Sequence, residues 1–150
     1  MSSTLRQDTR EAVLDVTAAN YGTSADIPAN RVVLLDTSNV MSTSSPRGVV
    51  LPTAAGGVAG TFGVTAEILY KRASSTAAPR PGRVALTGSG IQCIAEGAIT
   101  AGNYVQASDT ASKEGYVKVA GAGIQQIGQA ETTAADGEPV FIRIDKARNA

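Results

Sequence analysis

The second half of the chain alternates short apolar runs with glycine-containing turns. The expected strands are Val84–Leu86, Ile91–Ala95, Tyr104–Ala107, Tyr116–Ala120, Gln125–Ala130 and Val140–Ile144. The turn signals between them lie at residues 88–90, 101–103, 113–115, 121–123 and 136–137. Short strands at intervals of about 8–12 residues, with turns between them, indicate an all-β sandwich or barrel.

The first half carries fewer runs of this kind. Residues 31–36 form a β-branched run that favours a buried strand, although its periodicity alone leaves a helix open. Residues 49–51 and 64–70 are further expected strands, and Pro52 either stops the hydrogen-bond ladder of the first or places it at a sheet edge. The proline-containing stretch 73–82 predicts a linker. We therefore expect a β-domain over residues 31–150, a small β-barrel or β-sandwich.

Residues 1–30 follow a different pattern. A helix beginning at Asp8 or Thr9 would place Val13 and Leu14 in apolar contacts, and the rest of the segment is polar and rich in turn residues. An isolated helix this short is marginal in water. The segment therefore either docks on the domain or forms an extended or partly helical arm that orders on a partner. We expect the arm, because chain termini are loose unless they are tied down.

Two parts of the chain share an internal similarity. GVV at residues 48–50, followed by GVTAE at 63–67, resembles GYV at 115–117, followed by GQAE at 128–131. In a chain so rich in Ala and Gly, chance similarity is the alternative to a structural repeat. A true repeat would contain the same unit twice: a strand, a glycine-rich turn and a second strand.

Composition and charge narrow the classes of partner. The 13 basic and 13 acidic residues give a formal net charge of zero, so no large basic field attracts nucleic acid or a membrane surface. No charged-then-apolar leader opens the chain, and no apolar run approaches the roughly 18 residues of a membrane-spanning helix. We expect a protein that is made soluble and stays in a reducing cytoplasm, or leaves it only by lysis.

The side chains offer little for catalysis. The chain has no histidine and a single cysteine, Cys93, which lies in an apolar stretch and is expected to be a buried small hydrophobe. Carboxylates alone can hydrolyse glycosides, but the acidic residues here fall in or beside expected turns, where solvation explains them. They are Glu96, Asp109, Glu114, Asp136 and Glu138. We predict no catalytic, cofactor-binding or metal-binding residue, and no enzyme.

Two glycine-rich stretches also lack the features of a phosphate site. Residues 56–63, GGVAGTFG, match neither the phosphate loop nor the dinucleotide fingerprint, and no helix follows them. We expect a hairpin connection there, a loop over residues 37–48, and a tight turn at TGSG, residues 87–90.

Three phrases in residues 82–144 resemble the small head decoration, or capsid cement, proteins of tailed bacteriophages. The phrases are AITAGNYV at 98–105, GYV at 115–117, and IGQAE at 127–131 followed by DGEPVFI at 136–142. Asn103 stands where the family usually has an acidic residue, which a turn accommodates. Residues 1–81 match the family only loosely.

The resemblance implies a structural protein of the virion. Such a protein lacks enzymatic activity, binds the major capsid protein on the outer surface of the lattice, and stabilises the expanded head by bridging neighbouring capsid subunits. It also implies a homo-oligomer, with a trimer favoured. Two alternatives remain open: a structural module of the tail or of a head fibre, and a carboxylate-based phage enzyme.

Overall fold

Nine strands build the described part of the chain, and that part contains no helix. The computed structural model describes residues 13–38, 46–53 and 61–145. The strands are β1 Leu14–Ala19, β2 Val32–Leu35, β3 Arg47–Val50, β4 Thr61–Thr65, β5 Pro81–Ile94, β6 Tyr104–Ala107, β7 Val117–Val119, β8 Gly128–Ala130 and β9 Pro139–Ile144. They form one sheet in the order β1-β3-β2-β4-β5-β9-β8-β6-β7. The expected all-β class is confirmed.

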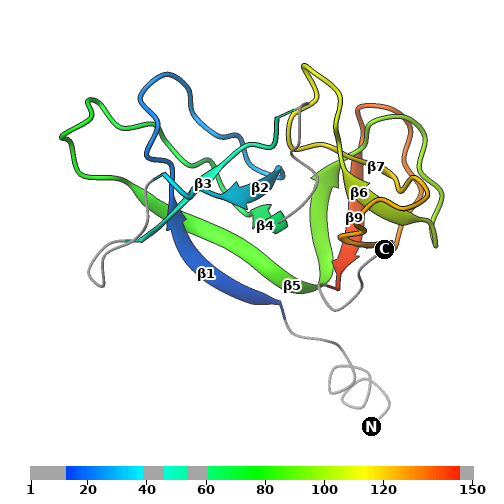
Figure 1. Cartoon of the computed structure of the whole chain (residues 1–150). Coiled ribbons are helices and arrows are strands. Elements are labelled where there is room, and N and C mark those ends of the chain that lie inside the picture. Colours follow the sequence, from blue (N-terminus) through cyan, green and yellow to red (C-terminus); the bar gives the residue numbers. More distant parts are fainter. Residues whose placement is uncertain (1–12, 39–45, 54–60, 146–150) are drawn as a thin grey trace, which may run out of the picture.

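The sheet curls into a first barrel at its N-terminal side (Figure 1). β1 pairs in parallel with β3 and, on its other edge, antiparallel with β5 from Leu14↔Thr87 to Ala19↔Pro81. This second pairing joins the first strand of the series β1-β3-β2-β4-β5 to the last one. The barrel is therefore closed, which removes its exposed sheet edges.

A second barrel follows from β5, β9, β8, β6 and β7. Its closure is a parallel bridge between Ala95, directly after β5, and Val117 of β7. The backbone N–H of Glu96 also donates to the carbonyl of Val117 at 2.7 Å. Both barrels thus share β5, which Figure 1 shows sweeping from one into the other.

β5 corrects the prediction of two separate strands with a turn at residues 87–90. One strand of 14 residues covers the whole stretch. Its register against β9 shifts between Gly88 and Ile91, and Gly88 and Gly90 have φ values of 124° and 72°. These two glycines form a bulge that redirects the strand without ending it, because only glycine adopts such φ values at low cost.

The two barrels repeat the same pairing scheme. The order β3-β2-β4-β5 of the first returns as β7-β6-β8-β9 in the second. Ile27, before β2, and Leu69, between β4 and β5, exchange two backbone hydrogen bonds at 2.9 Å. In the second barrel Ile99, before β6, and Ala134, between β8 and β9, do the same. The internal similarity seen in the sequence therefore reflects a structural repeat rather than chance.

The repeat also corrects one detail of that sequence similarity. Gly63 and Gly128 occupy equivalent places, since they pair with Val33 and Val105 respectively. On β3 and β7, however, the equivalent residues are Val49 and Val117, the partners of Leu35 and Ala107. The sequence match of GVV with GYV aligns Val49 with Tyr116, whereas the structure aligns Val49 with Val117, one residue later. The structural repeat extends over both whole barrels.

Each barrel has a small aliphatic core built from equivalent positions. The first core contains Ala18, Ile27, Val33, Val49, Leu69 and Val84. The corresponding residues of the second are Cys93, Ile99, Val105, Val117, Ala134 and Ile142. All twelve are at most 5% exposed. The strand expected at Val140–Ile144 is confirmed as β9, in which residues 140, 142 and 144 are buried while 139, 141 and 143 are exposed.

The segment before residue 30 differs from the helix expected there. Residues 14–19 form β1, and Ala18 and Ala19 are fully buried. Val16 and Ala18 pack on the first core, so apolar contacts within the barrel override the weak helical signal. Residues 1–12 lie outside the described part. The boundary between an arm at 1–30 and a domain at 31–150 stays a prediction.

Other expected bounds agree in part. The strand expected over residues 64–70 is β4, which begins at Thr61 and ends at Thr65. Beyond it, Leu69 makes only the isolated bridge to Ile27. Residues 39–45 and 54–60, which carry most of the loop expected over 37–48 and of the glycine-rich connection 56–63, lie outside the described residues.

Candidate functional site

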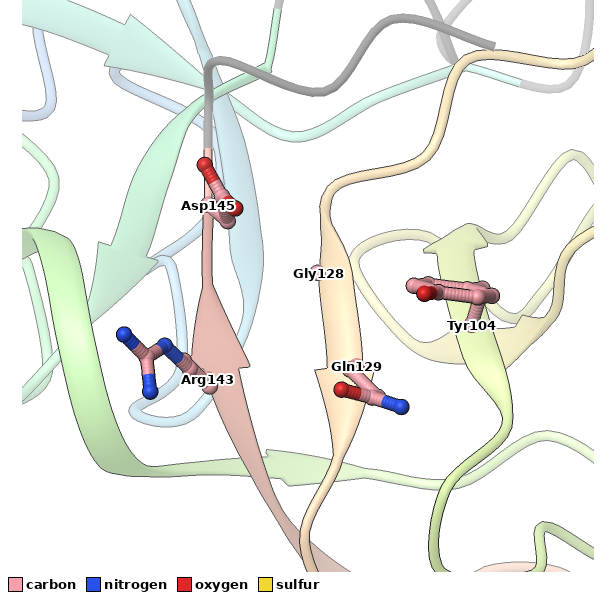
Figure 2. A pocket seen from close by; sticks show the side chains of 5 residues that line it. All are labelled: Tyr104, Gly128, Gln129, Arg143 and Asp145. Atoms are coloured by element: carbon pink, nitrogen blue, oxygen red, sulfur yellow. The ribbon is translucent and has the colours of Figure 1, made fainter.

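A row of polar side chains crosses the outer face of the second barrel. Tyr104 on β6 is paired with Gln129 on β8, which is paired in turn with Arg143 on β9. Figure 2 shows these three residues on three neighbouring strands. They lie on the same face because residues directly opposite in a sheet project to the same side.

The row lines an open cavity of about 300 Å³, together with Gly128 and Asp145. Tyr104 and Gln129 are half-buried and Arg143 is exposed. The side-chain amide of Gln129 donates to the carbonyl of Gly102 at 2.9 Å, which fixes the middle of the row. The lining is mostly polar, unlike the mainly apolar lining of pockets that take small organic ligands. The row instead presents polar groups that can form hydrogen bonds.

The equivalent row of the first barrel packs against the second barrel. Val32, Val64 and Ala85 stand opposite one another on β2, β4 and β5, at the positions equivalent to the polar row. They are 0%, 1% and 4% exposed and belong to the apolar cluster of the second barrel. This row on the outer face of the first barrel is therefore covered by the second barrel.

Polar contacts reinforce this junction between the barrels. The backbone N–H of Val32 donates to the carbonyl of Gly115 at 2.8 Å. The guanidinium of Arg31 lies 4.7 Å from the ring centre of Tyr116, a cation–π distance. In the first barrel this row is apolar and covered by the second barrel. At the equivalent positions of the second barrel, the row is polar and open.

The carboxylates expected in turns serve there as hydrogen-bond acceptors. Asp136 accepts from the N–H of Gly97 at 2.8 Å, and Glu138 accepts from the N–H of Ala135 at 3.1 Å. Glu114 accepts weakly from the N–H of Ser112 at 3.3 Å.

The remaining two carboxylates contact side chains. Glu96 accepts from the hydroxyls of Ser108 and Thr110. Asp109 pairs with Lys118, and this hydrogen bond lowers the pKa of the Asp109 carboxyl. Among the residues that the structure describes, no three His, Cys, Asp or Glu side chains gather as metal ligands would.

Cys93 lies in the second core, as its apolar sequence neighbours indicated. It is fully buried, and burial raises the pKa of its thiol to about 12. The thiol is therefore neutral near pH 7, whereas a nucleophilic cysteine needs the thiolate. Cys93 occupies the place that Ala18 takes in the first core.

Sequence reasoning missed the polar row. Tyr104, Gln129 and Arg143 are spread over 40 residues of the chain, and each is an ordinary residue for the exposed face of a strand. The internal repeat was the available signal, because it aligns Gln129 with Val64 once the two glycines, Gly63 and Gly128, are matched. Gln129 at the position equivalent to the buried Val64 indicates that this face is exposed in the second barrel.

The fold and the row define an all-β protein of two fused five-stranded barrels with an open polar face. No family model matches the chain, and a search of curated proteins finds no match. Across the described ranges, no helix is long and apolar enough to cross a membrane.

One solved structure has a similar fold over nearly the whole chain. It is the N base of head fiber gp8.5 of bacteriophage phi29, with a TM-score of 0.53 and 15% sequence identity. The alignment covers 90% of this chain and 96% of that chain. The likeness therefore extends over both barrels and their arrangement.

Proposed function

We propose that this protein is a structural component of a phage head, located on the outer surface of the capsid. The observation that carries this proposal is the fold shared with the N base of a phage head fiber, over 90% of the chain. The resemblance of residues 82–144 to head decoration proteins supports the same location independently, because it rests on sequence phrases and not on the fold. The protein acts by binding and not by catalysis.

In this role the protein bridges neighbouring subunits of the major capsid protein and holds the expanded head together. Many identical contacts repeated around a lattice act together through multivalency, so each contact can be modest. We propose the row of Tyr104, Gln129 and Arg143 as the attachment surface, because the equivalent row of the first barrel already accepts a protein surface. The base of a head fibre is a second candidate role, favoured by the similar structure, which is the N base of a head fiber.

Electron cryo-microscopy of the parent virion distinguishes these roles. A decoration protein is expected at regular positions over the whole shell, at the seams between capsomers. A fibre base is expected only beneath projecting fibres. Density confined to the tail contradicts both.

A binding experiment tests the attachment surface. Purified heads that lack this protein are incubated with the wild-type chain and with Tyr104→Ala/Arg143→Glu, and bound protein is measured after sedimentation of the heads. The variant should bind at least about tenfold more weakly, since a reversed charge in a protein contact commonly costs several kcal/mol. The matched control, Arg47→Glu/Lys113→Glu, should bind as the wild type does. Equal binding of all three proteins would exclude the row.

A further inference from the structure

The two ends of the molecule carry opposite charge. Residues 66–80, the basic end, lead into β5 and contain three basic residues and one acidic one. Residues 96–102 and 131–138, the acidic end, contain four acidic residues and no basic one. The two segments of the acidic end are joined by the bridge between Ile99 and Ala134. Figure 1 places the basic and acidic ends on opposite sides of the molecule, beyond the two ends of β5.

The basic end is a long, hydrogen-bonded loop, and the equivalent loop of the second barrel is shorter. Twelve positions separate Leu69 from Pro81, whereas five separate the equivalent residues Ala134 and Pro139. Arg72 organises the longer loop: its side chain donates to the carbonyls of Tyr21 and Ser75 at 2.9 Å each. Its guanidinium also lies 5.1 Å from the ring centre of Tyr21. The loop is therefore held in one shape before any partner binds.

This loop presents apolar side chains beside positive charge. Ile68 and Tyr70 are 44% and 46% exposed, which is unusual for large hydrophobic residues on one short segment. Arg80 is exposed and lies 5.7 Å from the ring centre of Tyr70. The exposed Lys71 is anchored through its backbone N–H, which donates to Asp26 at 2.9 Å.

The acidic end has the complementary arrangement. Its carboxylates are positioned by backbone groups or hydroxyls, as Asp136 and Glu138 are, and Glu131 accepts from the N–H of Gly90 at 2.6 Å. The three ion pairs found among the described residues involve other carboxylates. Phe141, 41% exposed, lies next to Glu131, since its carbonyl accepts from the N–H of Glu131.

We infer that copies of this chain associate head to tail, with the basic end of one copy against the acidic end of the next. Each end has an exposed aromatic residue beside charged groups, Tyr70 beside Arg80 and Phe141 beside Glu131, which is the pattern of an apolar contact with a polar rim. The two ends face away from each other, so one copy cannot satisfy both. Such a heterologous contact closes into a ring or continues as a filament.

Charge reversal with rescue tests this interface on the free protein, independently of any capsid. Sedimentation velocity is measured for Lys71→Glu/Arg80→Glu and for Asp136→Lys/Glu138→Lys, alone and mixed in equal amounts. The wild type should form an oligomer, and each variant alone should associate at least about tenfold more weakly because like charges then meet. The mixture should restore the oligomer, because each acidic loop then finds a basic partner.

The control reverses two charges outside both ends, Arg47→Glu/Lys113→Glu, and should assemble as the wild type does. Circular dichroism checks that all variants are folded. Raising the salt concentration should weaken the wild-type oligomer, since exposed charges are screened. A monomeric wild type at high protein concentration, undiminished assembly of the two end variants, or a mixture that stays monomeric would each overturn the inference.

Discussion

Two glycines have the same structural task in the two barrels. Gly63 on β4 and Gly128 on β8 each face a carbonyl of the next strand, that of Ala85 or of Arg143. A Cβ at either position would lie under 3.0 Å from that oxygen, closer than real Cβ atoms approach. The absence of a side chain therefore allows β4 to approach β5, and β8 to approach β9.

Replacing one of these glycines should destabilise the protein without changing its charge. Gly128→Ala should lower the free energy of unfolding by about 1–3 kcal/mol, the usual cost of forcing an extra group into a packed site. Urea unfolding followed by circular dichroism measures the change. In the control Gly121→Ala, the nearest atoms to the new Cβ are 3.5 and 3.6 Å away, so stability should stay within about 0.5 kcal/mol. Equal stability of the two variants would contradict the close approach.

At the scale of elements, β1 decides how the N-terminal region behaves in the free protein. Its pairing with β5 closes the first barrel, and Ala18 is part of the core. We predict slow amide hydrogen exchange at Val16 and Ala18 in the isolated protein, comparable to that of Val84 on β5, because opening β1 exposes the core. Ala111, in an exposed turn, serves as the fast-exchanging reference. Exchange of β1 as fast as that of Ala111 would instead indicate a segment that orders only on a partner.

Most individual strands could be predicted from the sequence, but their assembly could not. The limits of β6 and the buried face of β9 follow from alternation between turns, which is a local property. β1 is not predicted because its apolar residues are few, and they become significant only against β5, whose paired residues lie 62 or more positions later in the chain. Gly88 and Gly90 predict a turn from the sequence although they form a bulge, because a bulge and a turn use the same residue type.

The polar row and the charged ends show the same limit. Each is a juxtaposition of residues from distant strands or loops, such as Tyr104 with Arg143. The neighbouring sequence does not distinguish these residues from ordinary solvent-exposed ones. They can be recognised only when the pairing of the strands is known. Comparison of equivalent positions in the two barrels then identifies the polar row, because the row is covered in the first barrel and open in the second.

At the scale of the whole molecule, the shared β5 and the covered row predict that the two barrels unfold as one unit. Val64 stands on the first barrel yet is buried in the apolar cluster of the second. Val64→Ala should therefore destabilise both barrels, by about 1–3 kcal/mol, through lost burial and the cavity left behind.

Native-state hydrogen exchange of Val33 in the first barrel and Val105 in the second measures this coupling, because both amides should exchange through the same global opening and lose the same protection. The matched control is Gln129→Ala, at the equivalent but open position of the second barrel, which should change both by less than about 0.5 kcal/mol. If Val64→Ala lowers the protection of Val33 and leaves that of Val105 unchanged, the barrels are separate folding units. In that case the covered row is an interface between two domains that unfold separately, and it is not part of a single shared core.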